Sequence, residues 1–110
     1  MKLLKRKWKK MNNKKILSYI SMAQRARKLI SGTDMIIDTI RKDNKGIIIV
    51  AEDASKNTKK TLKDKASTYN TKVLEVFTIE ELSNAIGKEN RVAVYLQDEG
   101  FKNAIIKNIE

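Results

Sequence analysis

The chain has 110 residues and a formal net charge of +11, from 24 lysine and arginine residues against 13 aspartate and glutamate residues. This length suits one domain and leaves no room for a second hydrophobic core. The absence of cysteine and histidine excludes disulfides, Cys/His zinc sites and every catalytic arrangement that needs a thiol or an imidazole. No apolar run approaches the roughly 20 residues that span a bilayer. We therefore expect a cytoplasmic protein without a membrane segment. We also expect a monomer that needs no metal or cofactor and is not an enzyme.

The positive charge is concentrated at the N-terminus. Residues 1–15 contain eight basic and no acidic side chains, whereas the other 95 residues contain 16 basic and 13 acidic ones. This distribution favours a polyanion, nucleic acid above all, as the partner. Three interpretations of residues 1–13 stay open: a disordered basic arm, a mis-assigned start upstream of Met11, and a membrane anchor that Leu3, Leu4 and Trp8 would support only weakly.

The first half of the chain, from residue 14 onward, alternates between helical and strand-like hydrophobic patterns. Apolar residues at helical spacing predict a helix over 14–27, and a short extended segment is expected at 28–30. A second helix is predicted over 33–42. Its start is indicated by Ser31, an oxygen-bearing residue three positions before Asp34, as in a capping box.

The second half continues the alternation. Residues 47–51 are apolar without a polar partner face, which is typical of a strand covered on both sides. The remaining predicted elements are a helix over 55–69 capped by Ser55, a strand over 72–77, a helix from the capping box at Thr78 to Ile86, a strand over 92–96 and a last helix capped by Asp98. Residues 14–110 are therefore expected to form an α/β fold, a single-domain three-layer α/β/α sandwich around a small mixed sheet.

The acidic and basic residues of the predicted strands and helices do not form a recognisable active site. Glu52 and Asp53 follow the central strand, where α/β folds often bind ligands. Adjacent strand residues point to opposite faces, so we interpret this pair as turn residues. The helix at 55–69 carries five lysines, which we interpret as a solvated outer face rather than a phosphate-contacting one.

The predicted helix start at Gly32 is a better candidate for a binding site. Its free amides could hold an anion or a phosphate, and glycine lets another backbone approach closely. Asp34, Asp38 and Lys42 fall in one exposed stripe at 100° per residue. The alternative is an ordinary surface helix in which Asp34 only complements the helix dipole.

Three segments in this order carry a resemblance to a known family: residues 26–34 (ARKLISGTD), 49–55 (IVAEDAS) and 86–89 (IGKE). From about residue 14 to 109 the chain resembles the bacterial YlxQ proteins of the kink-turn-binding ribosomal protein superfamily. The resemblance implies an α/β/α sandwich without enzymatic activity. It also implies binding of RNA kink-turns, in which a bulge beside tandem sheared G·A pairs bends the duplex sharply.

The resemblance assigns RNA contacts to two regions. The family signature Gly-Thr-Asn-Glu-x-x-Lys aligns with residues 32–38, where Gly32 and Thr33 match. The second family pattern, Leu-Gly-x-Ala-x-Gly-Ile-Glu-Val, falls on residues 82–90. By this resemblance the candidate RNA-binding residues are Arg27, Lys28, Gly32, Thr33, Asp34, Met35, Asp38, Lys42, Gly87, Lys88, Glu89 and Asn90.

The chain departs from the family at several of these positions. Asp34, Met35 and Asp38 replace an asparagine, a glutamate and a lysine, whereas Lys42 keeps the charge of an arginine. In the second region the apolar pair that packs on the bulge is replaced by Lys88 and Asn90. The departures predict weaker binding or a preference for a different bent RNA. A general structured-RNA or ribosome-associated factor without kink-turn specificity, and a protein-interaction module, remain the alternatives.

Overall fold

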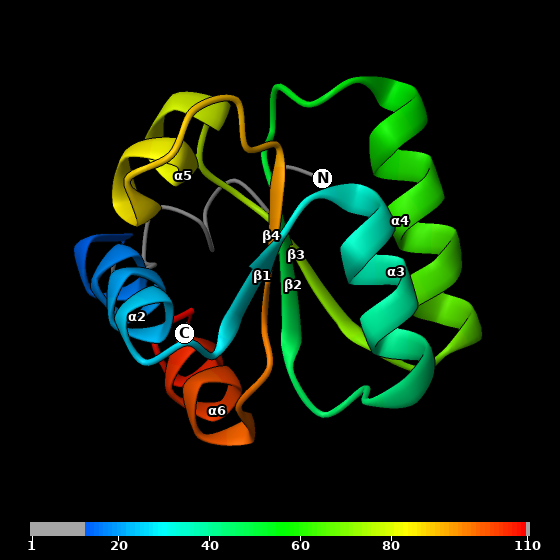
Figure 1. Ribbon diagram of the computed structural model, residues 1–110, viewed down its shortest axis with the longest axis horizontal. Coiled ribbons are helices and arrows are strands. Elements are labelled where there is room, and N and C mark those ends of the chain that lie inside the picture. Colours follow the sequence, from blue (N-terminus) through cyan, green and yellow to red (C-terminus); the bar gives the residue numbers. More distant parts are fainter. Residues whose placement is uncertain (1–12, 110) are drawn as a thin grey trace.

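The computed structural model describes residues 13–109, so nearly all of the basic arm predicted at residues 1–13 lies outside the described residues. The elements are, in chain order, α2 (Asn13–Arg25), β1 (Leu29–Ser31), α3 (Thr33–Lys42), β2 (Ile47–Val50), α4 (Lys56–Thr68), β3 (Lys72–Glu75), α5 (Ile79–Ile86), β4 (Ala93–Leu96) and α6 (Glu99–Lys107). Figure 1 shows the sheet edge-on between two helical layers, with α2, α5 and α6 on one face and α3 and α4 on the other. The predicted three-layer α/β/α sandwich is confirmed. Within the described residues, no helix has the length and apolar character to cross a membrane.

The four strands form a mixed sheet in the order β1-β4-β2-β3. β4 is antiparallel to both of its neighbours, β1 and β2, whereas β2 and β3 are parallel. The strands β1, β2 and β3 therefore all end at the same edge of the sheet, which we call the carboxyl edge, and β4 begins there. The opposite edge is called the amino edge.

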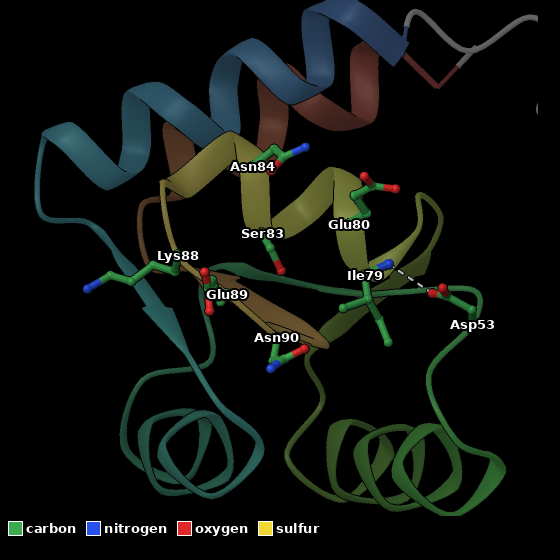
Figure 2. Close-up of a pocket in the computed structure, with 8 residues that line it drawn as sticks. All are labelled: Asp53, Ile79, Glu80, Ser83, Asn84, Lys88, Glu89 and Asn90. Atoms are coloured by element: carbon green, nitrogen blue, oxygen red, sulfur yellow. Dashed lines mark hydrogen bonds between the residues drawn. The ribbon is translucent and has the colours of Figure 1, made fainter.

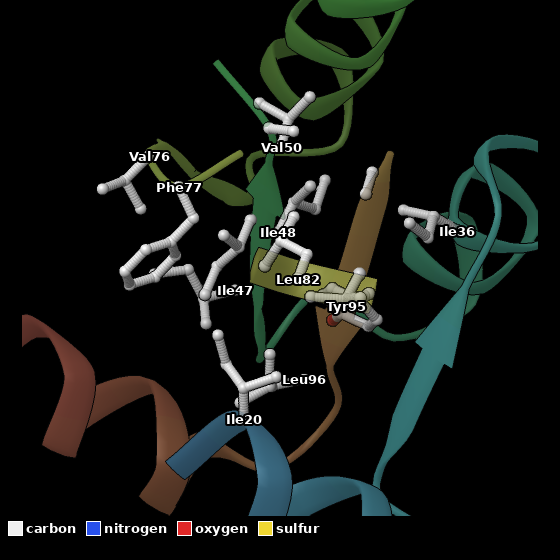
Figure 3. Close-up of a cluster of buried hydrophobic side chains, with 14 of the residues drawn as sticks. Ile20, Ile36, Ile47, Ile48, Val50, Val76, Phe77, Leu82, Tyr95 and Leu96 are labelled. Carbon is white, nitrogen blue, oxygen red and sulfur yellow. The ribbon is translucent and has the colours of Figure 1, made fainter. Parts of the chain in front are cut away.

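The two central strands are buried on both faces. All four residues of β2 and all four of β4 are buried, and Figure 3 shows Ile48 and Tyr95 within the cluster of apolar side chains around them. On the helices the buried positions include Ile20 of α2, Ile36 of α3 and Leu62 of α4. Continuous burial explains why the run at 47–51 has no polar alternation, as the sequence predicted.

Three of the predicted helix caps are confirmed by their hydrogen bonds. The hydroxyl of Ser55 accepts from the N–H of Thr58, and the carboxylate of Asp98 accepts from the N–H of Gly100. Thr78 and Glu81 form a complete capping box at the start of α5. The prediction of a capping box at Ser31 is wrong, because α3 has no side-chain cap. Ser31 is paired with Val94 in the sheet, and one glycine between strand and helix leaves no room for a serine cap.

Three of the predicted strands were too long. The strand expected at 47–51 ends at Val50. The strand expected at 72–77 ends at Glu75, because Phe77 has a φ of +69° that takes the chain out of the extended conformation. The short segment expected at 28–30 is β1, one residue further along. The strand expected at 92–96 begins at Ala93 rather than Val92.

A buried tyrosine hydroxyl joins the sheet to the turn before β2. Tyr95 is fully buried, and its hydroxyl donates to the carbonyl oxygen of Asp43 at 2.6 Å and accepts from the N–H of Gly46 at 3.0 Å. Burial raises the pKa of this hydroxyl above its ordinary value, so it is neutral and able to donate at physiological pH. Tyr95 thus fixes the path of residues 43–46.

The lysines of α4 are largely held by acidic partners. Lys63 and Lys59 contact the Glu75 carboxylate at 2.6 and 3.2 Å, and Lys60 pairs with Asp64 at 3.2 Å. The hydrogen bond from Lys63 lowers the pKa of Glu75, with a further contribution from Lys59, and both outweigh the opposing effect of burial. The middle of α4 is therefore a salt-bridged outer face.

Replacing Glu75 by glutamine is expected to lower the free energy of unfolding at pH 7 by about 1 kcal/mol, since a partly exposed ion pair contributes little more. Because the folded pKa is lowered, this stabilisation is present above the ordinary carboxyl value of 4.5 and is lost as the pH falls through the folded value. Chemical denaturation of the wild type and the Glu75→Gln variant at several pH values from 7 to 3 measures this pH dependence. The two unfolding curves should converge in acid, whereas Lys60→Gln, which breaks a well-exposed pair, should match the wild type throughout. A wild-type advantage that persists at pH 3 would contradict this role.

Candidate functional site

The junction between β1 and α3 is made by one glycine in a conformation that other residues avoid. Gly32 has φ +100° and ψ +134°, and α3 begins at the next residue without a side-chain cap. Its N–H donates to the carbonyl oxygen of Ala93 at 3.3 Å, and its carbonyl oxygen accepts from Ile36 at 3.0 Å. No atom lies within 4 Å of the place where a Cβ would be. The glycine is therefore needed for backbone shape, and the space beside it is open to a ligand.

The exposed face of α3 carries the other residues predicted from the first motif. Asp34, Met35, Asp38 and Lys42 are all exposed, whereas Ile36 is buried. Met35 has 58 % of its surface exposed, the larger of the two values for exposed large apolar side chains in the described chain. The start of α3 thus presents backbone amides, a carboxylate and an apolar side chain in one turn. This combination can bind a phosphate, accept from a base and pack against a base face.

The loop between α5 and β4 holds the residues predicted from the second motif. Gly87 is left-handed, with φ +70°, and ends α5 with hydrogen bonds from its own N–H to Asn84 and from the N–H of Lys88 to Ser83. This is the Schellman arrangement of a helix end. The buried Ser83 hydroxyl then accepts from the N–H of Arg91 at 2.9 Å. The loop is thus held at both ends, while Lys88, Glu89 and Asn90 stay exposed.

An open hollow lies beside this loop. It has a volume of about 420 Å³ and is lined by Asp53, Ile79, Glu80, Ser83, Asn84, Lys88, Glu89 and Asn90. Figure 2 shows Asp53 and Glu80 on one side of it, and Lys88 on the other with its amine pointing outward. The Asp53 carboxylate accepts from the N–H of Ile79 at 2.8 Å, so it fixes the start of α5. This bond supports the interpretation of Asp53 as a turn residue.

The two predicted regions meet at one corner of the carboxyl edge. The loop ends where β4 begins, at Ala93, and Gly32 donates to that same residue. The start of α3 therefore lies on one side of this corner and the loop between α5 and β4 on the other, as the top of Figure 1 shows.

Three predicted residues do not lie at this corner. Arg27 and Lys28 precede β1 at the amino edge, and the three residues of this strand, about 10 Å long, separate them from Gly32. Lys42 ends the ten-residue α3, about 15 Å along the helix from the same glycine. Asp38 lies between, one turn beyond Asp34. A ligand that contacts all twelve predicted residues must therefore extend well beyond the corner.

The carboxyl edge is acidic. The segments that reach it (residues 32–38, 52–56, 78–81 and 87–91) contain seven acidic and three basic side chains. Glu80, Ser83 and Asn84 line the hollow but are not among the residues predicted from the sequence. Their spacing of three and four positions places them on one helix face that leads to Lys88, and this periodicity was the signal available.

Residues 14–106 match the family described as ribosomal protein L7Ae/L30e/S12e/Gadd45. The chain is 38 % identical over 91 residues to the RNA-binding protein YlxQ of Bacillus subtilis (strain 168), covering 83 % of this chain and 91 % of that protein. It is 40 % identical over 99 residues to the RNA-binding protein YlxQ of Enterococcus faecium, and this match covers 90 % of this chain and 95 % of that protein.

Two solved structures agree with the fold. A protein of unknown function from Bacillus halodurans superposes with a TM-score of 0.82 at 34 % identity, over 86 % of this chain and 96 % of that one. The Giardia lamblia 15.5kD RNA binding protein superposes with a TM-score of 0.72 at 11 % identity, over 84 % of this chain and 80 % of that one. At this low identity the similarity shows only that the two proteins share a fold. The match along nearly the whole described chain and the similarity to YlxQ proteins together show that the chain is a YlxQ-like member of the L7Ae/L30e/S12e/Gadd45 ribosomal protein family.

Proposed function

We propose that this protein binds structured RNA with a kink-turn or a related sharp bend, and that it does so in the cytoplasm, on or near the ribosome. Its two curated relatives are named as RNA-binding proteins. The observation that carries the proposal is the open, uncapped start of α3 at Gly32, which faces the same corner as the loop at 87–90. A bent RNA can present a bulge and a base-pair edge to these two elements together.

Each element has a role in this proposal. The amides at the start of α3 bind a phosphate, because the helix dipole and the free N–H groups both favour an anion. The carboxylate of Asp34 accepts from guanine amino and imino groups, which sheared G·A pairs expose in a widened groove. Met35 gives the exposed base an apolar surface, and Lys88 binds phosphate from the other side of the corner.

The acidic character of the carboxyl edge favours a second candidate function. Seven carboxylates near the corner repel phosphate, so a structured-RNA binder that uses its basic surfaces and ignores the kink is the alternative. A competition experiment separates the two. A kink-turn RNA competes against the same RNA with its sheared G·A pairs changed to Watson–Crick pairs, at two salt concentrations. Kink-turn recognition predicts a preference that persists at the higher salt, because base contacts do not depend on counterion release. Equal affinities for the two RNAs would overturn it in favour of the second candidate.

Replacing Lys42 by alanine is expected to weaken the binding of kinked and straight RNAs by similar factors. Lys42 is exposed at the far end of α3 from Gly32, so its charge can reach phosphate but not the corner. Its loss should reduce the slope of log affinity against log salt by about 1. Lys107→Ala, at the end of α6 on the other face of the sheet, is the matched control and should leave the slope nearly unchanged. A selective loss of kink-turn preference in Lys42→Ala would contradict this role.

A further inference from the structure

A cluster of basic side chains lies at the end of the molecule opposite the candidate site. Two segments supply it, the end of α3 with the turn before β2 and the end of α4 with the turn before β3. We call it the Tyr69 cluster, and its members are Arg41, Lys42, Lys45, Lys65 and Lys72, all of them exposed. The two segments, residues 41–45 and 65–72, contain these five bases and one acid. The lower right of Figure 1 shows the ends of α3 and α4 together.

Tyr69 joins the two segments into one surface. The Nε of Arg41 donates to the Tyr69 hydroxyl at 3.2 Å, and its guanidinium carbon lies 6.0 Å from the centre of the ring. The side-chain amide of Asn44 donates to the Tyr69 carbonyl oxygen at 2.8 Å. Lys72 begins β3 and is paired in register with Ile47, two residues after Lys45. The basic groups are thus held on a fixed framework.

The charges of this cluster are not neutralised within the described part of the chain. The lysines in the middle of α4 pair with Glu75 and Asp64, whereas no ion pair there involves a member of the Tyr69 cluster. The single acid, Asp43, is half-buried and accepts from the backbone N–H of Lys45. Two further acids at the amino edge, Asp98 and Glu99, begin α6 on the other face of the sheet. Arg41, Lys42 and Lys65 lie in the last turns of helices, where a basic residue complements the helix dipole. This reason does not apply to Lys45 and Lys72, which lie outside the helices.

The surface suits nucleic acid better than protein. Protein interfaces need a buried apolar core, and the exposed large apolar side chains of the described chain, Met22 and Met35, both lie outside the cluster. Protein–nucleic acid contacts are instead polar and positively charged, and several basic side chains gathered on one surface favour a row of phosphates.

We propose that the Tyr69 cluster is a second RNA contact, which binds the phosphate backbone of a helix flanking the bend. This inference rests on the proposed function, since it takes RNA to be the ligand. The length of α3 places the cluster about 15 Å from Gly32, so one RNA arm that leaves the corner along α3 reaches it. The corner at the carboxyl edge then recognises the bend, while the Tyr69 cluster supplies much of the electrostatic affinity.

The test compares the double variant Lys45→Gln/Lys72→Gln with the control Lys102→Gln/Lys107→Gln, which removes the same charge from α6. Neither pair includes a residue of the candidate site at the corner. Both proteins, checked for unchanged thermal unfolding, are titrated with a kink-turn RNA carrying a long flanking helix and with one truncated just beyond the G·A pairs. We expect the cluster variant to bind the long RNA about tenfold more weakly near 0.1 M salt, with a salt slope reduced by about 2. Its binding of the truncated RNA and its preference for the kinked form should match those of the wild type.

Two other outcomes would overturn the inference and are distinguishable. If the cluster variant keeps the affinity and salt slope of the control on the long RNA, the second contact does not exist, although the proposed function stands. If the wild-type protein binds neither RNA, the proposed function fails and this inference fails with it.

Discussion

Replacing Gly46 by alanine is expected to lower the free energy of unfolding by about 3 kcal/mol or more, an unusually large effect for one methyl group. A Cβ at this position would overlap the backbone carbonyl of Leu96 on the neighbouring strand, an obstacle that no side-chain rotation removes. The backbone at residue 46 would have to move to relieve this overlap. That movement would break the hydrogen bond from the Gly46 N–H to the buried hydroxyl of Tyr95. In thermal denaturation the midpoint should fall by roughly 12 °C or more.

Gly87→Ala is the matched control for this change. Gly87 is left-handed with open space around it, so an alanine there adds backbone strain of about 1 kcal/mol without an overlap. The control should therefore lose markedly less stability than Gly46→Ala. If the two variants lost equal stability, the close approach of Gly46 to the neighbouring strand would not be the cause of the loss.

Replacing Asp34 by alanine is expected to remove about 1–3 kcal/mol of discrimination between kinked and straight RNA, the usual size of one well-placed base contact. Asp34 is the exposed carboxylate of the first turn of α3, next to the open space at Gly32. Because the change also removes a negative charge, binding of straight RNA should strengthen slightly. The stability of the fold should stay within about 1 kcal/mol of the wild type.

The measurement is the ratio of dissociation constants for the kink-turn RNA and its Watson–Crick control. Glu99→Ala is the matched variant, since Glu99 is an exposed acid in the first turn of α6 on the other face of the sheet. It should leave the ratio unchanged. An unchanged ratio in a folded Asp34→Ala protein would favour the second candidate, a binder of structured RNA that ignores the kink.

Much of the fold was predictable because local chemistry and burial agree. The run at 47–51 is apolar throughout because both of its faces are covered, and the caps at Ser55, Thr78 and Asp98 act within their own turns. The strand ends were less predictable. Phe77 is an apolar residue of high strand propensity, yet its position requires a positive φ, which only the tertiary structure imposes.

The candidate site was predictable in its motifs but not in its geometry. The motif around Gly32 marked the start of α3, whereas the capping serine suggested by local sequence proved to be a strand residue. Which residues share a corner depends on the sheet order, and β4 brings its loop to Gly32 by pairing between β1 and β2. The Tyr69 cluster also arises from residues about 25 positions apart, so no local pattern marks it.

RNA is expected to contact the corner formed by the start of α3 and the loop at 87–90. Amide chemical-shift mapping of the full chain, titrated with the truncated kink-turn RNA, tests it most directly. We predict that the largest shifts occur at Gly32, Thr33 and Asp34 and at residues 88–90, with small shifts on α6. Shifts confined to α2 and α6, or spread evenly over the basic surfaces with none at Gly32, would contradict it.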